Sequence, residues 1–383
     1  MTESTASPMG RARSLVAGRD PLPTVVALVS LAVYLAHGWL GALLRDLSIY
    51  VYAGQQVLHG HAPYVGILNR AGPLAHLVPA LGIALGRVFG LSDVVGARLF
   101  FMVVSIACVV SVYFWGRLVL GTRLAGLAGA AAMLCFHGFV EYATNGPREK
   151  SVMVLLFVWV LIDLHKRNWL RAGVWLALST LTLQIIFPPG AAAALVALVA
   201  AGAGARLRGL LRFAAGGIAA TAVVALYFLV VGALDDAVQG FLVINARYTT
   251  PDPFFDAAQA NWNHLVDGYG ASLAVLILGA VALLVAGVVA ALTWRRPAED
   301  PLATRARAVA PAAAAVVLAV IWSMRDFDNW PDAFPLLPLA AFGVALVAAV
   351  LVSSVTIRVG VAIVAIWAVV ATTDAVVYAT STR

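Results

Sequence analysis

The chain has 383 residues, of which 62% are hydrophobic and 11% charged, and its mean hydropathy is +0.95. Soluble domains carry about 25% charged residues, so this composition leaves too little polar surface for a water-soluble fold and excludes the soluble enzyme classes. The net charge of +7 does not indicate nucleic-acid binding, because the basic residues fall mainly in the loops between apolar segments. The composition predicts an all-α, polytopic integral membrane protein.

The polar N-terminal residues 1–22 contain three arginines and precede the first apolar segment. That segment is too long for a signal peptide and has no small-residue cleavage site. We therefore predict a cytoplasmic tail over 1–22 and a single membrane domain over 23–383. Cys108 and Cys135 lie inside apolar segments, which indicates packed thiols rather than a disulfide or a metal pair.

Eleven segments reach or approach the roughly 17–25 apolar residues that a membrane-crossing helix needs. They are predicted at 23–44, 95–116, 124–142, 151–165, 169–187, 189–204, 213–234, 270–293, 308–323, 334–353 and 359–377. A twelfth apolar segment, 72–90, is short and contains His76 and Pro79. Its pattern alone leaves open whether it crosses the membrane or lies on it.

The distribution of arginine and lysine decides between these arrangements, because cytoplasmic loops carry an excess of both residues. If 72–90 does not cross, sixteen of the 25 basic residues lie inside and nine lie outside. If it crosses, every later loop changes sides and the numbers become ten and fifteen. We therefore predict that 72–90 does not cross and that the N-terminus is cytoplasmic.

This topology gives a long first external loop over 45–92. From Leu47, apolar residues recur at helical spacing until Gly60, which predicts one helix that lies on the membrane. The segment 72–89 is predicted to form a second. Further external loops are expected at 235–269 and 323–335, and the sequence shows no internal repeat.

Polar residues gather on the predicted external side, where a binding or catalytic site is therefore expected. They are Arg45-Asp46, Asn69-Arg70, Glu141, Asn145, Arg148-Glu149-Lys150, Asn245, Arg247-Tyr248, Arg325, Asp326, Asp328 and Asp332. The internal loops offer mainly arginines.

The motifs of the first external loop resemble, in order and spacing, those of the polytopic GT-C glycosyltransferases that use polyprenyl-phosphate sugars. The stretches that carry the resemblance are Arg45-Asp46-Leu47-Ser48-Ile49-Tyr50, Ala53-Gly54 and Val57-Leu58-His59-Gly60-His61-Ala62-Pro63-Tyr64. They are similar to an Asp, Tyr, Ala-Gly, Leu-x-Gly, Pro-Tyr pattern. Asn69-Arg70-Ala71-Gly72-Pro73-Leu74 resembles the basic, proline-containing segment that follows, and 142–150 is placed like the second acidic loop.

The resemblance covers the first 165 residues and, through the number of spans, the rest of the chain. It implies a GT-C-like fold of about 11 transmembrane helices with two juxtamembrane helices, in the plasma membrane, with an extracytoplasmic active site. The implied activity is an inverting hexosyl- or pentosyltransferase, similar to mannosyl- or arabinosyltransferases of cell-wall biosynthesis. The donor would be a polyprenyl-phosphate-linked sugar, and the acceptor a glycan, glycolipid or glycoprotein.

Sugar transfer from a lipid phosphate needs a base for the acceptor hydroxyl and cations for the phosphate that leaves. Asp46 is the expected general base, and Glu149 is a second catalytic candidate. Arg325 is expected to be the best anchored cation, because its loop is short and contains Trp330 and Pro331. The substrate- and phosphate-binding candidates are Arg325, Arg148, Lys150, Arg247, Arg70, Tyr50 and Tyr64.

Simpler interpretations remain open for these residues. Asp46 could form only an interfacial ion pair with Arg45, Glu149 could lie in a solvated loop, and Arg325 could form a local salt bridge with the acids beside it. His59 and His61 bracket a glycine, but the spacing places no third ligand. The sequence therefore predicts no metal site and leaves dependence on a divalent cation open.

The main alternative function is a secondary transporter or a flippase for lipids or glycolipids. Transporters place polar or broken helices near the middle of the bilayer, whereas the polar residues here gather at the outer surface. A scaffold without catalytic activity would leave the loops of Asp46 and Glu149 unexplained.

Overall fold

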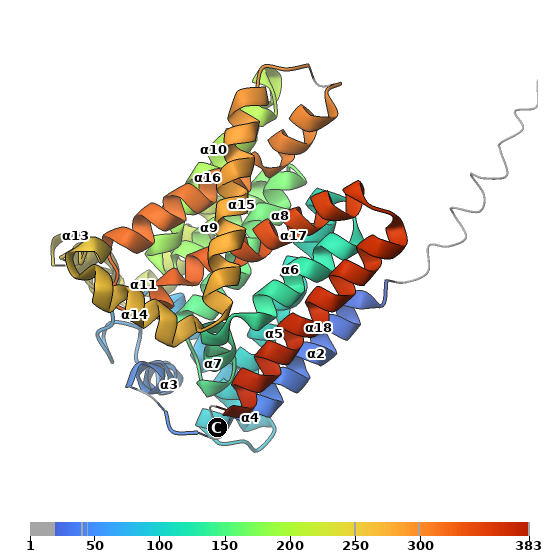
Figure 1. Cartoon of the computed structure of the whole chain (residues 1–383). Helices are drawn as coiled ribbons and strands as arrows, with labels where there is room; N and C mark the ends of the chain where they lie inside the picture. Colours follow the sequence, from blue (N-terminus) through green and yellow to red (C-terminus); the bar gives the residue numbers. More distant parts are fainter. Residues whose placement is uncertain (1–19, 40, 44, 249, 298, 382–383) are drawn as a thin grey trace, which may run out of the picture.

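The computed structural model describes residues 20–39, 41–43, 45–248, 250–297 and 299–381, without the side chain of Arg45 (Figure 1). Of the predicted cytoplasmic tail, residues 1–19 lie outside the described residues. Every regular element in the described part of the chain is a helix, so the predicted all-α class is confirmed.

Each of the eleven predicted apolar segments coincides with a helix or with two successive helices. The helices are α2 (Leu22–His37), α5 (Asp93–Leu120), α6 (Arg123–Cys135), α7 (His137–Asn145), α8 (Glu149–His165), α9 (Trp169–Thr180), α10 (Phe187–Ala200), α11 (Ala203–Val230), α15 (Ser272–Thr293), α16 (Pro301–Arg325), α17 (Leu337–Ser354) and α18 (Ile357–Ser381).

Six segments of the described chain are helical, long and apolar enough to cross a membrane: α5, α11, α15, α16, α17 with the turn before it, and α18. The successive helices α6 and α7 make a seventh if they form one span, and α2 and α10 are apolar but shorter. These helices indicate a multi-pass membrane protein. That all eleven predicted segments cross the membrane stays a prediction.

The helices α6 and α7 replace the single straight span predicted over 124–142. They meet at an angle of 70°, and the residue between them, Phe136, has the extended backbone angles φ −68° and ψ 107°. The backbone N–H of His137 after the break donates a hydrogen bond to Ser272 Oγ at 3.2 Å. A side chain from another helix thus satisfies a backbone group that the break leaves without a helical partner.

The segment predicted to be the first external loop contains both predicted helices, α3 (Arg45–Leu58) and α4 (Leu74–Val88). They pack against each other, and α4 also packs against α5. The buried face of α3 carries Leu47, Tyr50 and Val51, while Tyr52 is exposed. The predicted loop at 235–269 holds further helices, as does the turn before α17. They are α12 (Leu234–Ala237), η2 (Val238–Val243), α13 (Ile244–Arg247), η3 (Phe254–Ala257), α14 (Ala258–Tyr269) and η4 (Trp330–Leu336).

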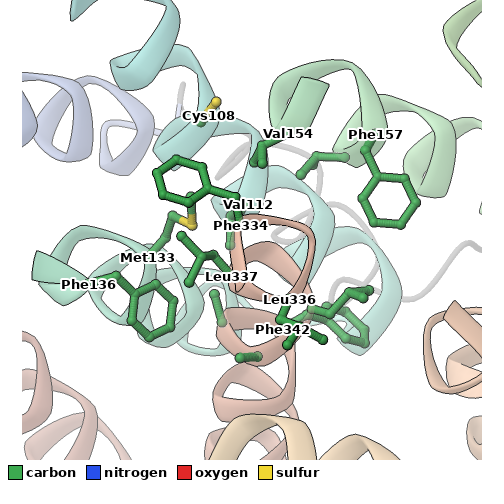
Figure 2. Packing of buried hydrophobic residues seen from close by; sticks show 14 of the residues in the cluster. Cys108, Val112, Met133, Phe136, Val154, Phe157, Phe334, Leu336, Leu337 and Phe342 are labelled. Atoms are coloured by element: carbon green, nitrogen blue, oxygen red, sulfur yellow. The ribbon is translucent and has the colours of Figure 1, made fainter. Parts of the chain in front are cut away.

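The main hydrophobic cluster joins α5, α6, α8 and α17 (Figure 2). Val112, Met133, Phe157 and Phe342 come from these four helices, and each is at most 1% exposed. Lipid tails are as apolar as these side chains, so within a bilayer the hydrophobic effect does not drive the helices together. Such contacts stabilise the helix bundle through close van der Waals packing instead.

The helices α15 and α17 touch through their backbones. A Cβ atom added to Gly279 would lie 2.0 Å from the carbonyl oxygen of Ala340, and one added to Gly343 would lie 1.9 Å from that of Gly279. Both distances are shorter than real Cβ atoms allow, so both positions require glycine. Small residues of this kind let membrane helices approach closely.

The helix α18 lies beside α2 (Figure 1) and also contacts α7. Two polar contacts join α7 to α18: His137 Nε2 lies 2.8 Å from Asp374 Oδ2, and the Tyr378 hydroxyl donates to Glu141 Oε2 at 3.3 Å. Tyr142, the next residue of α7, contacts the side chains of the candidate site described below.

Candidate active site

A cavity of about 570 Å³ lies where the first turns of α3 and α8 meet the C-terminal end of α16. Its lining comes from seven parts of the chain, and three of them are loops or short helices outside the predicted spans, namely 68–71, Asn245 and 326–332. The polar lining residues are Asp46, Tyr50, Asn69, Arg70, Arg148, Glu149, Lys150, Gln184, Asn245, Ser323, Asp326, Asp328 and Asp332. Six of the predicted site residues, Asp46, Tyr50, Arg70, Arg148, Glu149 and Lys150, are therefore together in one cavity.

Asp46 and Arg148 form an ion pair in this cavity. Arg148 Nη1 donates a hydrogen bond to Asp46 Oδ2 at 2.6 Å. The side chain of Arg148 is 8% exposed, whereas that of Asp46 is 56% exposed. The guanidinium carbon of Arg148 also lies 4.9 Å from the ring centroid of Tyr142 and 6.0 Å from that of Tyr50. A buried cation is thus held between two rings and a carboxylate that stays open to the cavity.

Glu149 is buried, and its position does not fit a solvated loop. Its Oε2 lies 3.6 Å from Arg148 Nε, and neither atom has a hydrogen-bond partner among the described residues. The hydroxyl of Tyr50 lies close to the side chains of Glu149 and Asn69. Burial, and then the charge of Glu149, raise the pKa of Tyr50 well above its ordinary value. Tyr50 therefore stays neutral and can donate a hydrogen bond at physiological pH.

Lys150 is held by the loop that follows α16. Its Nζ lies 2.6 Å from Asp332 Oδ1, while Asp332 Oδ2 accepts hydrogen bonds from the backbone N–H groups of Asp328 and Asn329, each at 3.0 Å. The lysine side chain is 7% exposed. Breaking a buried pair of this kind leaves one charge without compensation, so this contact fixes the loop against the first turn of α8.

Arg98 joins the two chain segments that lead into Asp46 and Arg148. Its Nη1 and Nη2 donate to the carbonyl oxygens of Trp39 and Gly41 at 2.9 and 2.6 Å, and its Nε donates to that of Asn145 at 3.1 Å. This role of Arg98 was not predicted from the sequence. The available signal was a cation near the start of the predicted span 95–116, where charged residues usually have a specific task.

The segment 68–71 enters the cavity because the chain after it docks on the turn that follows α9. The backbone N–H groups of Gly72 and Leu74 donate to the carbonyl oxygens of Thr182 and Leu181, each at 3.0 Å. A Cβ on Gly72 would lie 2.0 Å from the Leu181 oxygen, so this docking requires glycine. The contact brings Arg70 and Gln184 to the same cavity.

Gln184 is a lining residue that the sequence analysis missed, because 169–187 was predicted to be one continuous span. In the structure α9 ends at Thr180, and Gln184 lies in the short helix η1 (Gln184–Ile186). Its Oε1 is buried without a hydrogen-bond partner among the described residues. The adjacent Pro188-Pro189 was the signal that the helix is interrupted here.

Three predicted substrate-binding residues do not line the cavity. Tyr64 is buried behind it, where its hydroxyl donates to the carbonyl oxygen of Ala71 at 2.8 Å. Arg247 is exposed at the end of α13. Arg325 is also exposed, and its guanidinium carbon lies 5.5 Å from the ring centroid of Trp322.

The expectation that Arg325 is the best anchored external cation is therefore wrong. The helix α16 continues to Arg325, and the helical turn directs Ser323 and Trp322 to the cavity while Arg325 faces solvent. Arg148 and Lys150 are the buried cations of the site. Among the described residues, no group of three or more His, Cys, Asp or Glu side chains is arranged to hold a metal ion.

No family model matches the chain, and no curated protein matches it in sequence. Its fold is similar to that of ArnT from Cupriavidus metallidurans in the apo state, with a TM-score of 0.60 and 16% identity, covering 88% of this chain and 60% of that one. The same protein bound to undecaprenyl phosphate gives a TM-score of 0.59 and 15% identity, covering 86% of this chain and 60% of that one. The chain thus spans about 60% of the length of ArnT, and the resemblance to the GT-C glycosyltransferases is confirmed at the level of the fold.

Proposed function

We propose that this protein is a membrane glycosyltransferase that moves a sugar from a polyprenyl-phosphate donor to a hydroxyl acceptor in the cavity around Asp46. One observation carries the proposal: an accessible carboxylate lies 2.6 Å from a buried arginine, and Lys150 and Arg70 line the same cavity. A carboxylate can accept a proton and the cations beside it can bind a phosphate, which are the two functions that transfer from a phosphate requires. A similar fold that binds undecaprenyl phosphate supports the choice of donor class.

In the proposed reaction, the acceptor hydroxyl oxygen attacks the anomeric carbon of the sugar and gives its proton to Asp46. The bond between that carbon and the phosphate oxygen breaks, and its electron pair leaves with the polyprenyl phosphate. The phosphate thereby changes from one negative charge to two. A single displacement inverts the configuration at the anomeric carbon.

We propose that Arg148 is the main group that stabilises the added negative charge of the phosphate. Lys150 and Arg70 are further contacts. Arg148 is already buried and oriented, so it need not reorganise when the charge develops. Its Nε and the Oε2 of Glu149 lack hydrogen-bond partners among the described residues. Buried polar atoms of this kind normally have partners, and polar groups of the substrate would provide them. We assign Glu149 to a second catalytic role, through the orientation of Arg148 and Tyr50.

Arg247 and Arg325 have a weaker proposed role. Each lies two residues or fewer from a residue that lines the cavity, and both are exposed. Exposed cations attract an anion over a distance of about 10 Å at 0.1 M salt. We therefore propose that they attract the donor, whereas Tyr64 supports the loop through its bond to Ala71.

The proposal is tested by incubating the purified full chain with a panel of polyprenyl-phosphate sugars and short hydroxyl acceptors, with and without a chelator. We expect release of polyprenyl phosphate together with a glycosylated acceptor for at least one donor, and the chelator arm establishes dependence on a divalent cation. Transport of a lipid-linked sugar across vesicles without any glycosylated product would instead favour a flippase.

We further propose that the protein lies in the plasma membrane and that the cavity faces outward. The distribution of arginines supports this orientation. In cells, an impermeant thiol reagent should label Asp328→Cys, at the cavity, and should leave Arg208→Cys unlabelled until the membrane is opened. Both positions are exposed, and the native Cys108 and Cys135 are at most 2% exposed, so background labelling should be low. The reverse labelling pattern would place the cavity in the cytoplasm.

A further inference from the structure

A second cavity, of about 400 Å³, lies at the opposite ends of two helices that border the first one. The helix α8 begins at Glu149 in the first cavity and ends at His165 in the second, and α16 contributes Ser323 to the first and Thr304 to the second. A helix of 17 residues, the length of α8, is about 25 Å long. The two cavities are therefore separate sites near opposite faces of the helix bundle.

The lining of this second cavity is divided by polarity. One part is apolar and includes Trp115 and Phe342, whose rings stack with centroids 4.0 Å apart. The other part carries the polar side chains His165, Arg167, Thr304 and Arg307. The described lining contains no Asp or Glu, so its charge is positive or neutral and favours an anionic ligand.

Arg167 lines the cavity from an unusual backbone conformation. Its φ of 57° lies in the left-handed region, where glycine is favoured and other residues are strained. Its side chain forms no ion pair with any described acid, whereas the nearby Arg171 lies 3.1 Å from Asp163. An arginine at a position that favours glycine, without an acidic partner, indicates that its side chain has a task at this cavity.

Arg307 supplies a second cation, and its guanidinium is held in place by hydrogen bonds. Its Nη2 donates to the carbonyl oxygen of Trp294 at 3.0 Å and to that of Arg296. These carbonyls belong to the end of α15 and the turn after it, so they hold the guanidinium at the cavity. Two cations from different parts of the chain thus converge on one cavity whose remaining wall is apolar.

We propose that this second cavity binds an anionic phospholipid, with its phosphate at Arg167 and Arg307 and an acyl chain against Trp115 and Phe342. Positive charge beside aromatic side chains complements both parts of such a lipid, and basic pockets between membrane helices bind lipid head groups. The helix α10 lines the cavity and exposes apolar side chains such as Val199, next to which lipid chains would pack. The proposal is independent of the sugar transfer proposed above.

The test uses the purified full chain in mixed micelles that contain phosphatidylglycerol or, as the neutral lipid, phosphatidylcholine. We expect phosphatidylglycerol to raise the midpoint of thermal unfolding more than phosphatidylcholine does. In Arg167→Gly, the phosphatidylglycerol content needed for half of the maximal shift should rise at least about tenfold, the effect of losing one charged hydrogen bond. Glycine suits the left-handed backbone, so this variant should fold without strain.

Lys166→Ala is the matched control, because Lys166 is an exposed cation one residue away that does not line the cavity. It should respond to phosphatidylglycerol like the unmodified protein. Three results would overturn the proposal: an equal loss in Lys166→Ala, an equal shift with phosphatidylcholine, or an equal shift with inorganic phosphate. The first result would show attraction by the general surface charge, the second would show apolar contact alone, and the third would show a site for free anions.

Discussion

Replacing Asp46 with asparagine is expected to lower the rate of sugar transfer by about 100- to 10,000-fold, the usual contribution of a positioned base. The amide oxygen can still accept the hydrogen bond from Arg148 Nη1, so the geometry of the pair is kept while the proton acceptor is lost. Donor binding should therefore change little. The measurement is the turnover rate at saturating donor, with donor affinity determined separately.

Asp328→Asn is the control for this experiment. Asp328 is exposed and lines the same cavity, but the hydrogen bond described for it is made by its backbone N–H. The same change of charge should lower its turnover only a few-fold. If Asp46→Asn keeps a rate within a few-fold of the unmodified protein, Asp46 is a structural partner of Arg148 and not the base.

Replacing Arg148 with alanine is expected to lower kcat/KM for the lipid-phosphate donor by at least about 100-fold, as for other oriented groups that stabilise developing charge. Arg148→Lys should recover only part of this loss, because a single ammonium group cannot bind a phosphate through two parallel hydrogen bonds. The measurement is the transfer rate as a function of donor concentration. Thermal unfolding of both variants separates this effect from a loss of folding caused by leaving Glu149 without its cation.

Arg325→Ala provides the comparison, because Arg325 is an exposed cation near the same cavity. We expect it to change kcat/KM by about threefold or less, as for the small contribution of exposed charges. If Arg325→Ala loses as much activity as Arg148→Ala, the phosphate binds nearer to Arg325, as the sequence alone suggested.

The apolar stretches predicted the positions of the membrane helices well, because about 20 apolar residues in sequence have few alternatives to a helix in a bilayer. The break between α6 and α7 was not predicted. No proline marks it, and it depends on partners from distant parts of the chain, such as Ser272 for the N–H of His137. The short helices between 234 and 269 were missed for the related reason that polar and apolar residues alternate there without a long apolar run.

The sequence predicted which residues belong to the site better than it predicted which residues contact each other there. Arg148 and Lys150 were both expected to bind the phosphate, but successive side chains of a helix point in different directions. Arg148 consequently pairs with Asp46 and Lys150 with Asp332, over 102 and 182 residues of sequence. Arg98 illustrates the limit most clearly, since its partners are backbone carbonyls and any residue can supply a carbonyl. A sequence pattern therefore cannot identify such partners.

The backbone contact between α15 and α17 bears on how homologous sequences should be compared. Gly279 and Gly343 cannot vary without separating the two helices, so we expect evolution to preserve them as strictly as it preserves Asp46. Invariance at these glycines would result from the close contact between two helices. It would therefore persist in relatives with different substrates. Invariance at Asp46 would follow the chemistry and disappear in relatives that have lost it. A relative that keeps both glycines but replaces Asp46 is therefore expected to fold in the same way and to have a different activity.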